Sequence, residues 1–405
     1  MTNPFKGDSI KNLLPKYKGV FYNSKKGVVK VALKKLHIML NTKSFFGMCK
    51  SQMFGNKNAC QSLTFTVIAL STIGVFVPSF AQVLPSIEIQ VLEKGTLVSY
   101  FEQKSKMRQD ISGAAFGPGG LLIVDDGGEN AEFPSIRTLN PNKVSEPSAT
   151  LPLGRFYRDM EAVAWMGDRY LITTSMSLVG EDHPSYRLLG EVFYEEKKRT
   201  FRQGRMTDYR EVIIKALSKV TNDSLWFTRT ISTFAKYGGV NVEGLASVPN
   251  NNDAVIFGLR SPLVNPRFGN PAIDKKLTLD SGKTILVKVI APFSDEPLTE
   301  PMLLDLEGQG VRSLEYISSI NAYIIIAGST HSDKGRFQLW LWSMENSSIQ
   351  KVHLPELDEL CRPESIVALP SKSGVDILIL SENSGDACTG SKIQYIKFNL
   401  KRGLQ

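Results

Sequence analysis

The stretch Asn241–Pro262, NVEGLASVPNNNDAVIFGLRSP, decides the fold because it has the pattern of a β-hairpin. A short run that alternates polar with apolar residues leads to an Asn-rich turn, and a run of branched apolar residues follows. Two such runs around a polar turn are typical of paired antiparallel strands. Glu243, near the start, and Arg260, near the end, are therefore predicted to lie at the same end of the hairpin.

Four other segments share this pattern. They begin at Asp110, Asp159, Gly310 and Arg362 and read DISGAAFGPGGLLIVDDGG, DMEAVAWMGDRYLITTSMS, GVRSLEYISSINAYIIIAGST and RPESIVALPSKSGVDILILSENSG. After the segment at Gly310 come RFQLWLWSM and SIQKVHLP, two more strand-like runs that complete a set of four. Four strands per repeat predict an all-β propeller of four-stranded antiparallel blades. Five hairpins predict five blades, with six as the alternative.

The fifth blade lacks one strand, because only KIQYIKFNL follows its hairpin before the C-terminus. The run SIEIQVL, Ser86 to Leu92, is predicted to supply that strand and to close the ring without leaving a sheet edge exposed.

A short helical insertion is predicted near 205–221, in the longest gap between two hairpins. Its apolar residues recur with the helical period of 3.6, and Thr207 is a candidate cap. These apolar residues are Val212, Ile213, Ala216, Leu217 and Val220.

Residues 1–81 are predicted to be a signal peptide or leader, and 82–405 a single propeller domain. The apolar run Leu63–Val77 follows lysines and precedes a small-residue site that ends at Ala81, which is the order found in signal peptides. We expect cleavage after Ala81 and export to the periplasm or the exterior. An uncleaved membrane anchor at 63–80 is the alternative. The leader is long for a signal peptide, and a start at Met48 or Met53 would give an ordinary length.

The net charge of +8 comes from the N-terminus. Residues 1–81 contain 12 Lys and one acidic residue, whereas 82–405 contain 36 basic and 39 acidic residues. The body is therefore mildly acidic, which argues against nucleic acid as a partner. Nothing indicates an oligomer, so we expect a monomer that meets a membrane only through an uncleaved leader.

Two cysteines, Cys361 and Cys388, lie in the body of the chain. A cysteine pair in an exported chain predicts a disulfide, with two core thiols as the alternative.

The chain resembles the bacterial family of the domain of unknown function 3616, over most of 105–400. The motifs that carry the resemblance are EGLA, GLRSP, DLEGQGVRSLE and PESIVAL, which begin at Glu243, Gly258, Asp305 and Pro363. The resemblance implies a propeller and no established activity. By looser hairpin similarity, the chain is also similar to esterase-like phytase propellers.

Charged residues at the hairpin ends form the candidate site, because the first-strand starts and second-strand ends of all blades meet on one face. The predicted ligand-binding residues are Glu161, Glu243, Arg260, Arg312, Glu364 and Glu382. His331, in a loop of the same face, is the acid/base candidate. Asp125 and Asp126 are candidate metal ligands, although DDGG is also read as a turn.

Two functions remain open. The first is a binding propeller that takes a small anionic molecule, a glycan or a protein on its channel face, with arginines contacting the anion. The second is a calcium-dependent phosphoester hydrolase, suggested by the phytase-like similarity. Carboxylates without Cys or His suit calcium, the one cofactor that the sequence suggests. A purely structural role, in which the glutamates set blade geometry, is the alternative for each single residue.

Overall fold

The computed structural model describes residues 84–96, 111–125, 135–140, 143–152, 157–178, 184–235, 238–264, 282–330, 335–372, 374–382 and 393–403. All of them lie in the unit that begins at Ala81, one residue before the predicted propeller domain. The leader, the anchor alternative at 63–80 and the cleavage site lie outside the described residues. None of the described helices is both long and apolar enough to cross a membrane.

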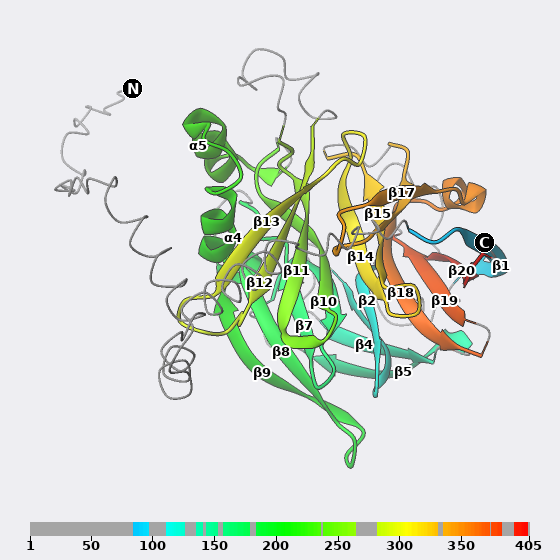
Figure 1. Ribbon diagram of the computed structural model, residues 1–405. Helices are drawn as coiled ribbons and strands as arrows, with labels where there is room; N and C mark the ends of the chain where they lie inside the picture. Colours follow the sequence, from blue (N-terminus) through cyan, green and yellow to red (C-terminus); the bar gives the residue numbers. More distant parts are fainter. Residues whose placement is uncertain are drawn as a thin grey trace, which may run out of the picture. The chain divides into compact units, whose positions relative to one another are not determined.

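The described strands form five four-stranded antiparallel sheets, which are the blades of a propeller (Figure 1). Blade 1 contains β2 (Ile111–Gly117), β3 (Gly120–Asp125), β4 (Ser135–Asn140) and β5 (Lys143–Pro152). Blade 2 contains β6 (Met160–Trp165), β7 (Tyr170–Thr174), β8 (Leu188–Glu195) and β9 (Thr200–Asp208). Blade 3 contains β10 (Asn241–Val248), β11 (Asn251–Ser261), β12 (Thr284–Ile290) and β13 (Leu298–Leu304).

The last two blades complete the ring. Blade 4 contains β14 (Gly310–Ile317), β15 (Ala322–Gly328), β16 (Gln338–Trp342) and β17 (Ile349–Val352). Blade 5 contains β18 (Pro363–Ser371), β19 (Gly374–Ser381), β20 (Gln394–Arg402) and, from the start of the chain, β1 (Ile87–Thr96). Pairing of β1 with β20 confirms the predicted closing strand, and Figure 1 shows the two side by side.

The innermost strands are β2, β6, β10, β14 and β18. Each contacts the next, and β18 contacts β2, so the described blades close into a ring of five. Five blades, not six, are thus found in the described part of the chain. The first strand of every predicted hairpin is the innermost strand of its blade.

The core lies between adjacent blades. Five clusters of buried side chains each join two neighbouring blades, because every sheet has two apolar faces. The second strands are the most buried: every residue of β7 and of β15 is buried. The outermost strands alternate or are largely exposed, as in β1 and β13. Burial on both faces explains why the second strands are continuous runs of branched apolar residues.

The insertion between blades 2 and 3 contains two helices, α4 (Arg210–Leu217) and α5 (Ser224–Ser232). The helix α4 lies within the predicted segment, and Ile213, Ala216 and Leu217 are buried as the period of 3.6 requires. Thr207 is not its cap, because Thr207 belongs to β9 and Tyr209 is the capping residue. The second helix was not predicted. Its cap is Asp223, whose side chain accepts hydrogen bonds from the backbone N–H groups of Leu225 and Trp226.

Candidate functional site

Every innermost strand carries a β-bulge close to its first residue. The pairing register of each hairpin skips one residue on the innermost strand, and the skipped residues are Ser112, Glu161, Glu243, Arg312 and Glu364. A bulged residue has no partner across the ladder, and the bulge re-aims its side chain. All five bulged side chains line one pocket. The same local irregularity, repeated in five blades, therefore builds the site.

The pocket has a volume of about 380 Å³, towards the lower end of the range for small-molecule sites. It lies where the innermost strands begin and the second strands end, so both ends of each hairpin contribute. Ser112 of blade 1 and Asn241 of blade 3 belong to its lining, and the other lining residues form two parts. The arginine half comes from blades 3 to 5 and consists of Glu243, Arg260, Arg312, Arg362, Glu364 and Glu382. The carboxyl half comes from blade 2 and the insertion and consists of Asp159, Glu161, Ser177, Leu178, Phe234 and Ala235.

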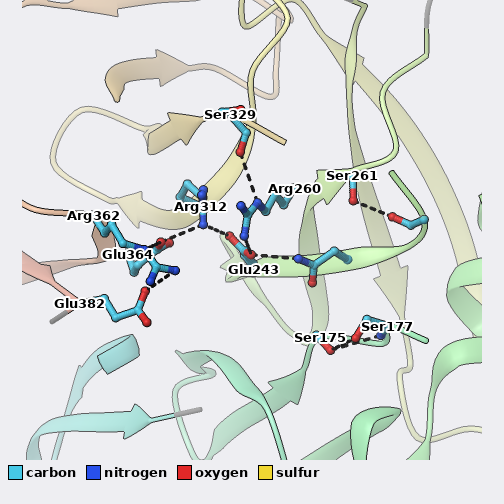
Figure 2. A network of polar contacts seen from close by, with 12 residues as sticks. Ser175, Ser177, Glu243, Arg260, Ser261, Arg312, Ser329, Arg362, Glu364 and Glu382 are labelled. Atoms are coloured by element: carbon cyan, nitrogen blue, oxygen red, sulfur yellow. Dashed lines mark hydrogen bonds and ion pairs between the residues drawn. The ribbon is translucent and has the colours of Figure 1, made fainter. Parts of the chain in front are cut away.

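Arg312 is the centre of the arginine half. Its side chain is only 1% exposed, and its Nη1 lies 3.0 Å from Glu243 Oε2 and 2.8 Å from Glu364 Oε1 (Figure 2). It therefore joins blades 3, 4 and 5. The guanidinium also lies over the ring of Phe337, 5.6 Å from its centroid. These contacts hold a buried cation between two carboxylates and an aromatic face.

Two further arginines pair with the same set of glutamates. Arg260 Nη1 donates to Glu243 Oε1 at 2.8 Å, and its Nε donates to the backbone oxygen of Ser329 at 3.3 Å. Arg362 Nη2 lies 2.6 Å from Glu382 Oε2 (Figure 2). Three arginines and three glutamates thus form one network, whose formal charges balance when all three carboxyl groups are ionised.

The carboxyl groups of this network differ in acidity. Burial alone would raise the pKa of Glu243, but Arg260 and Arg312 together hold it below its usual value. Burial raises the pKa of Glu364, and Glu243 and Glu382 add to the rise, while Arg312 opposes it. Neighbouring carboxyl groups whose pKa values are pushed apart can take different proton states at one pH.

The carboxyl half is built around Asp159. Burial raises the pKa of Asp159, the hydrogen bonds that its carboxylate accepts from Ser175, Glu161 and Ser177 lower it, and the charge of Glu243 raises it again. The two serines also bond to each other, with 2.6 Å between their Oγ atoms (Figure 2). The contacts that act on Asp159 therefore come from serines and other carboxyl groups.

The insertion supplies the apolar part of the carboxyl half. Phe234 and Ala235 follow Thr233, the residue that caps the C-terminus of α5, and Leu178 of blade 2 follows the second strand of that blade. Phe234 is 38% exposed, although most large apolar side chains of the described residues are buried. An aromatic side chain thus borders a pocket that is otherwise mainly charged.

The structure brings together all six ligand-binding residues predicted from charge at the hairpin ends, since all six line the pocket. That they bind a ligand stays a prediction. His331, Asp126 and the side chain of Asp125 lie outside the described residues. In the part of the chain that is described, no three His, Cys, Asp or Glu residues are grouped as metal ligands. Because the side chains of the two candidate ligands are not described, calcium binding stays a prediction.

Among the polar pocket residues that were missed are Asp159, Asn241 and Arg362. Each lies two positions before a bulged residue, and both side chains line the pocket. Asp159 and Arg362 have backbone φ values of 61° and 52°, in a region that non-glycine residues seldom occupy. The sequence did contain a signal for all three, because each is the first residue of one of the five hairpin segments.

Blade 4 has Gly310 at this position, and the reason is steric. A Cβ there would lie 1.9 Å from the backbone oxygen of Arg260. The close approach lets β14 start directly beside the end of β11, where Arg260 reaches Glu243. Gly310 thus supports the arginine half without contributing a side chain.

Cys361 directly precedes Arg362, and its backbone N–H donates to Gln394 Oε1 at 2.9 Å. Cys388 lies outside the described residues, so their disulfide also stays a prediction.

Comparison with known proteins names a family and finds several solved structures with limited similarity. Three similar solved structures are glutaminyl cyclase from Myxococcus xanthus, Sqt1 from Saccharomyces cerevisiae and the Cps50 (Swd1) β-propeller domain from Myceliophteria thermophila. Their identities to this chain are 13%, 12% and 11%, and their TM-scores are 0.40, 0.29 and 0.30. The matches cover 77%, 72% and 73% of this chain, and 97%, 60% and 66% of the respective structures.

No curated protein matches the sequence. The family profile described as "Protein of unknown function (DUF3616)" matches residues 168–379, just over half of the chain. This match contains the whole of blades 3 and 4 and most of the pocket. The chain therefore belongs to the DUF3616 family.

Proposed function

We propose that the pocket binds a small ligand through a positively charged group, an ammonium in particular, held by Asp159 and Glu161. One observation carries this proposal: the described lining of the pocket contains five carboxyl groups and three guanidinium groups. With every carboxyl group ionised, negative charge is in excess, and a cation is the ligand charge that complements it.

The state of Asp159 supports the same conclusion. Its carboxyl group shares a hydrogen bond with Glu161, and burial raises its pKa. Two adjacent carboxyl groups away from water keep a proton unless a cation neutralises them. An ammonium has three N–H donors, so it can bond to both carboxyl groups at once and replace that proton.

An anionic ligand held by Arg260 and Arg312, as first predicted, is less well supported. Arg312 is buried between two glutamates, so an anion would have to displace existing ion pairs. A glycan or a protein partner fits the proposal if it presents an amino group to the carboxyl half. The calcium-dependent hydrolase is the alternative, because the same carboxyl groups suit a hard cation.

Isothermal titration calorimetry of the full chain with small amines, small carboxylates and calcium tests these possibilities. The proposal predicts that amines bind and that Asp159→Asn, which keeps the size and tolerates the backbone at φ 61°, weakens them at least tenfold. Thr228→Ala, at an exposed residue of α5, is the control. Binding of carboxylates instead of amines would contradict the proposal. Calcium binding with phosphoester turnover would favour the hydrolase.

We also propose that the protein is exported, on the order of lysines, apolar run and small-residue site in 1–81. N-terminal sequencing of the protein from the extracytoplasmic fraction should give a first residue at Gln82. An intact leader recovered with the membrane fraction would favour the anchor at 63–80.

A further inference from the structure

The pocket has one large aromatic side chain among its described lining residues, Phe234. It comes from the insertion between blades 2 and 3, and it is more exposed than most other large apolar side chains of the described residues. Leaving an aromatic ring partly in water forgoes part of the free energy that its burial would supply. Because the ring also borders the pocket, we expect it to contact a bound ligand.

Phe234 is held in place by the backbone. The N–H of Gly239 donates to the Phe234 oxygen at 3.1 Å, and Ser261 Oγ donates to the Gly239 oxygen at 2.6 Å. A Cβ on Gly239 would lie 1.9 Å from the backbone oxygen of Thr233, so this close turn requires glycine. The segment that carries Phe234 is thus tied to the end of β11.

Arg210 joins this segment to blade 2. The side chain is buried, its Nη2 donates to the Ile231 oxygen at 3.0 Å, and its Nη1 donates to the Met176 oxygen. Ile231 belongs to α5, three residues before Phe234, and Met176 directly precedes the pocket residues Ser177 and Leu178. Arg210 therefore holds the segment that carries Phe234 against the residues that follow β7. Two of these residues, Ser175 and Ser177, form hydrogen bonds with Asp159.

From this arrangement we infer that Phe234 is a specificity-determining residue, which selects amines that carry an apolar or aromatic body. The inference rests on the proposed function, because it takes the ammonium to lie at Asp159 and Glu161. The ring, together with Leu178 and Ala235, then offers an apolar surface to the rest of the ligand. Simple amines without such a body would gain only the polar contacts.

One physical effect gives Phe234 this role. Contact of the ring with a second apolar or aromatic group removes both surfaces from water. This contact corresponds to roughly a tenfold gain in affinity for a ligand that carries such a group. The gain should depend on Phe234 and not on Asp159.

Four probes separate the parts of this inference: benzylamine, methylamine, benzyl alcohol and benzoate, each titrated into the full chain by calorimetry. Benzylamine should bind about tenfold more tightly than methylamine, and Phe234→Ala should abolish that difference. Leu225→Ala is the matched control, because Leu225 is a 44% exposed apolar residue of α5 that does not line the pocket.

Each outcome bears on one of the two proposals. Equal affinity of the two amines would overturn the inference about Phe234 and leave the ammonium site intact. If benzoate binds, Phe234→Ala weakens that binding and neither amine binds, then the ligand contact of Phe234 is supported and the ammonium site is overturned. Tight binding of benzyl alcohol that Phe234→Ala weakens would do the same. Failure of all four probes to bind would overturn both.

Discussion

The two halves of the pocket differ in how their charges are balanced. In the arginine half, Arg312 lies between Glu243 and Glu364, so the chain itself supplies both signs of charge. In the carboxyl half, Asp159 is surrounded by serines and other carboxyl groups, and its pKa is raised by burial. Both halves are built on the same repeated bulge. The comparison teaches that one structural position serves blade-to-blade contact in some blades and, under the proposed function, ligand contact in another.

The arginine half also shows what its charges do for the fold. Its ion pairs connect residues of different blades, such as Glu243 of blade 3 and Arg312 of blade 4. Buried ion pairs contribute little net stability, but loss of one partner leaves a buried charge without compensation. We therefore expect substitutions in this half to act on folding.

The largest effect is expected for Arg312→Ala. Removing the guanidinium leaves Glu243 and Glu364 buried without their shared partner, which should lower the free energy of unfolding by ~3–5 kcal/mol. Chemical denaturation measures this loss. Arg202→Ala is the control, because Arg202 is 57% exposed and pairs with Glu195 at the surface, so it should cost less than ~1 kcal/mol. Similar losses in the two variants would show that the buried network has no special role.

The next largest effect on stability is expected for loss of the predicted disulfide. If Cys361 and Cys388 are bonded, the bridge precedes Arg362 directly and anchors the edge of the arginine half, and Cys361→Ser should cost ~3 kcal/mol. Mass spectrometry of non-reduced digests detects the bridged peptides. Two free thiols in protein purified under oxidising conditions would rule the bridge out.

Gly310→Ala should have a smaller effect. The added Cβ would contact the backbone oxygen of Arg260, so β14 and β11 must separate, with a loss of ~1–3 kcal/mol. Thermal unfolding measures it. Gly403→Ala, near the C-terminus, would meet mainly the side chain of Ser86 and serves as the comparison. An unchanged melting temperature for Gly310→Ala would show that this contact yields easily.

Asp159→Asn tests the carboxyl half through the pH dependence of the free energy of unfolding. Because the native pKa of Asp159 is raised, the native state holds this proton more tightly than the unfolded state. The wild type then loses stability as pH rises from the ordinary Asp range to the native pKa, by at most ~1.4 kcal/mol per pH unit. The amide variant does not titrate, so its stability relative to wild type should rise over that window. A constant difference from pH 4 to 8 would contradict this account.

The fold could be predicted from the sequence because a hairpin repeats five times with the same polarity pattern. Even the closing strand at Ile87–Thr96 followed from the one strand missing in the last blade. The helix α5 escaped prediction, since its exposed Leu225 and partly exposed Phe227 weaken the apolar period. Its cap, Asp223, was the remaining signal.

The sequence predicted many residues of the candidate site, but it did not predict how their charges are paired. Charged residues at hairpin ends indicated a shared pocket, as Glu243 and Arg312 now illustrate. Which arginine pairs with which glutamate depends on contacts between blades, and these are absent from the pattern of any single hairpin. Phe234 could not be predicted either, because its position depends on the buried bonds of Arg210 to Met176 and Ile231.

A crystal structure of the protein with benzylamine would test the central claim most directly. The account predicts that the ammonium nitrogen lies within hydrogen-bond distance of the carboxyl groups of Asp159 and Glu161, at about 2.7–3.2 Å, with the aromatic ring against Phe234. The ion pairs of Arg312 should remain as they are without ligand. An empty carboxyl half, or a ligand that opens the arginine half and binds Arg260 and Arg312, would contradict it.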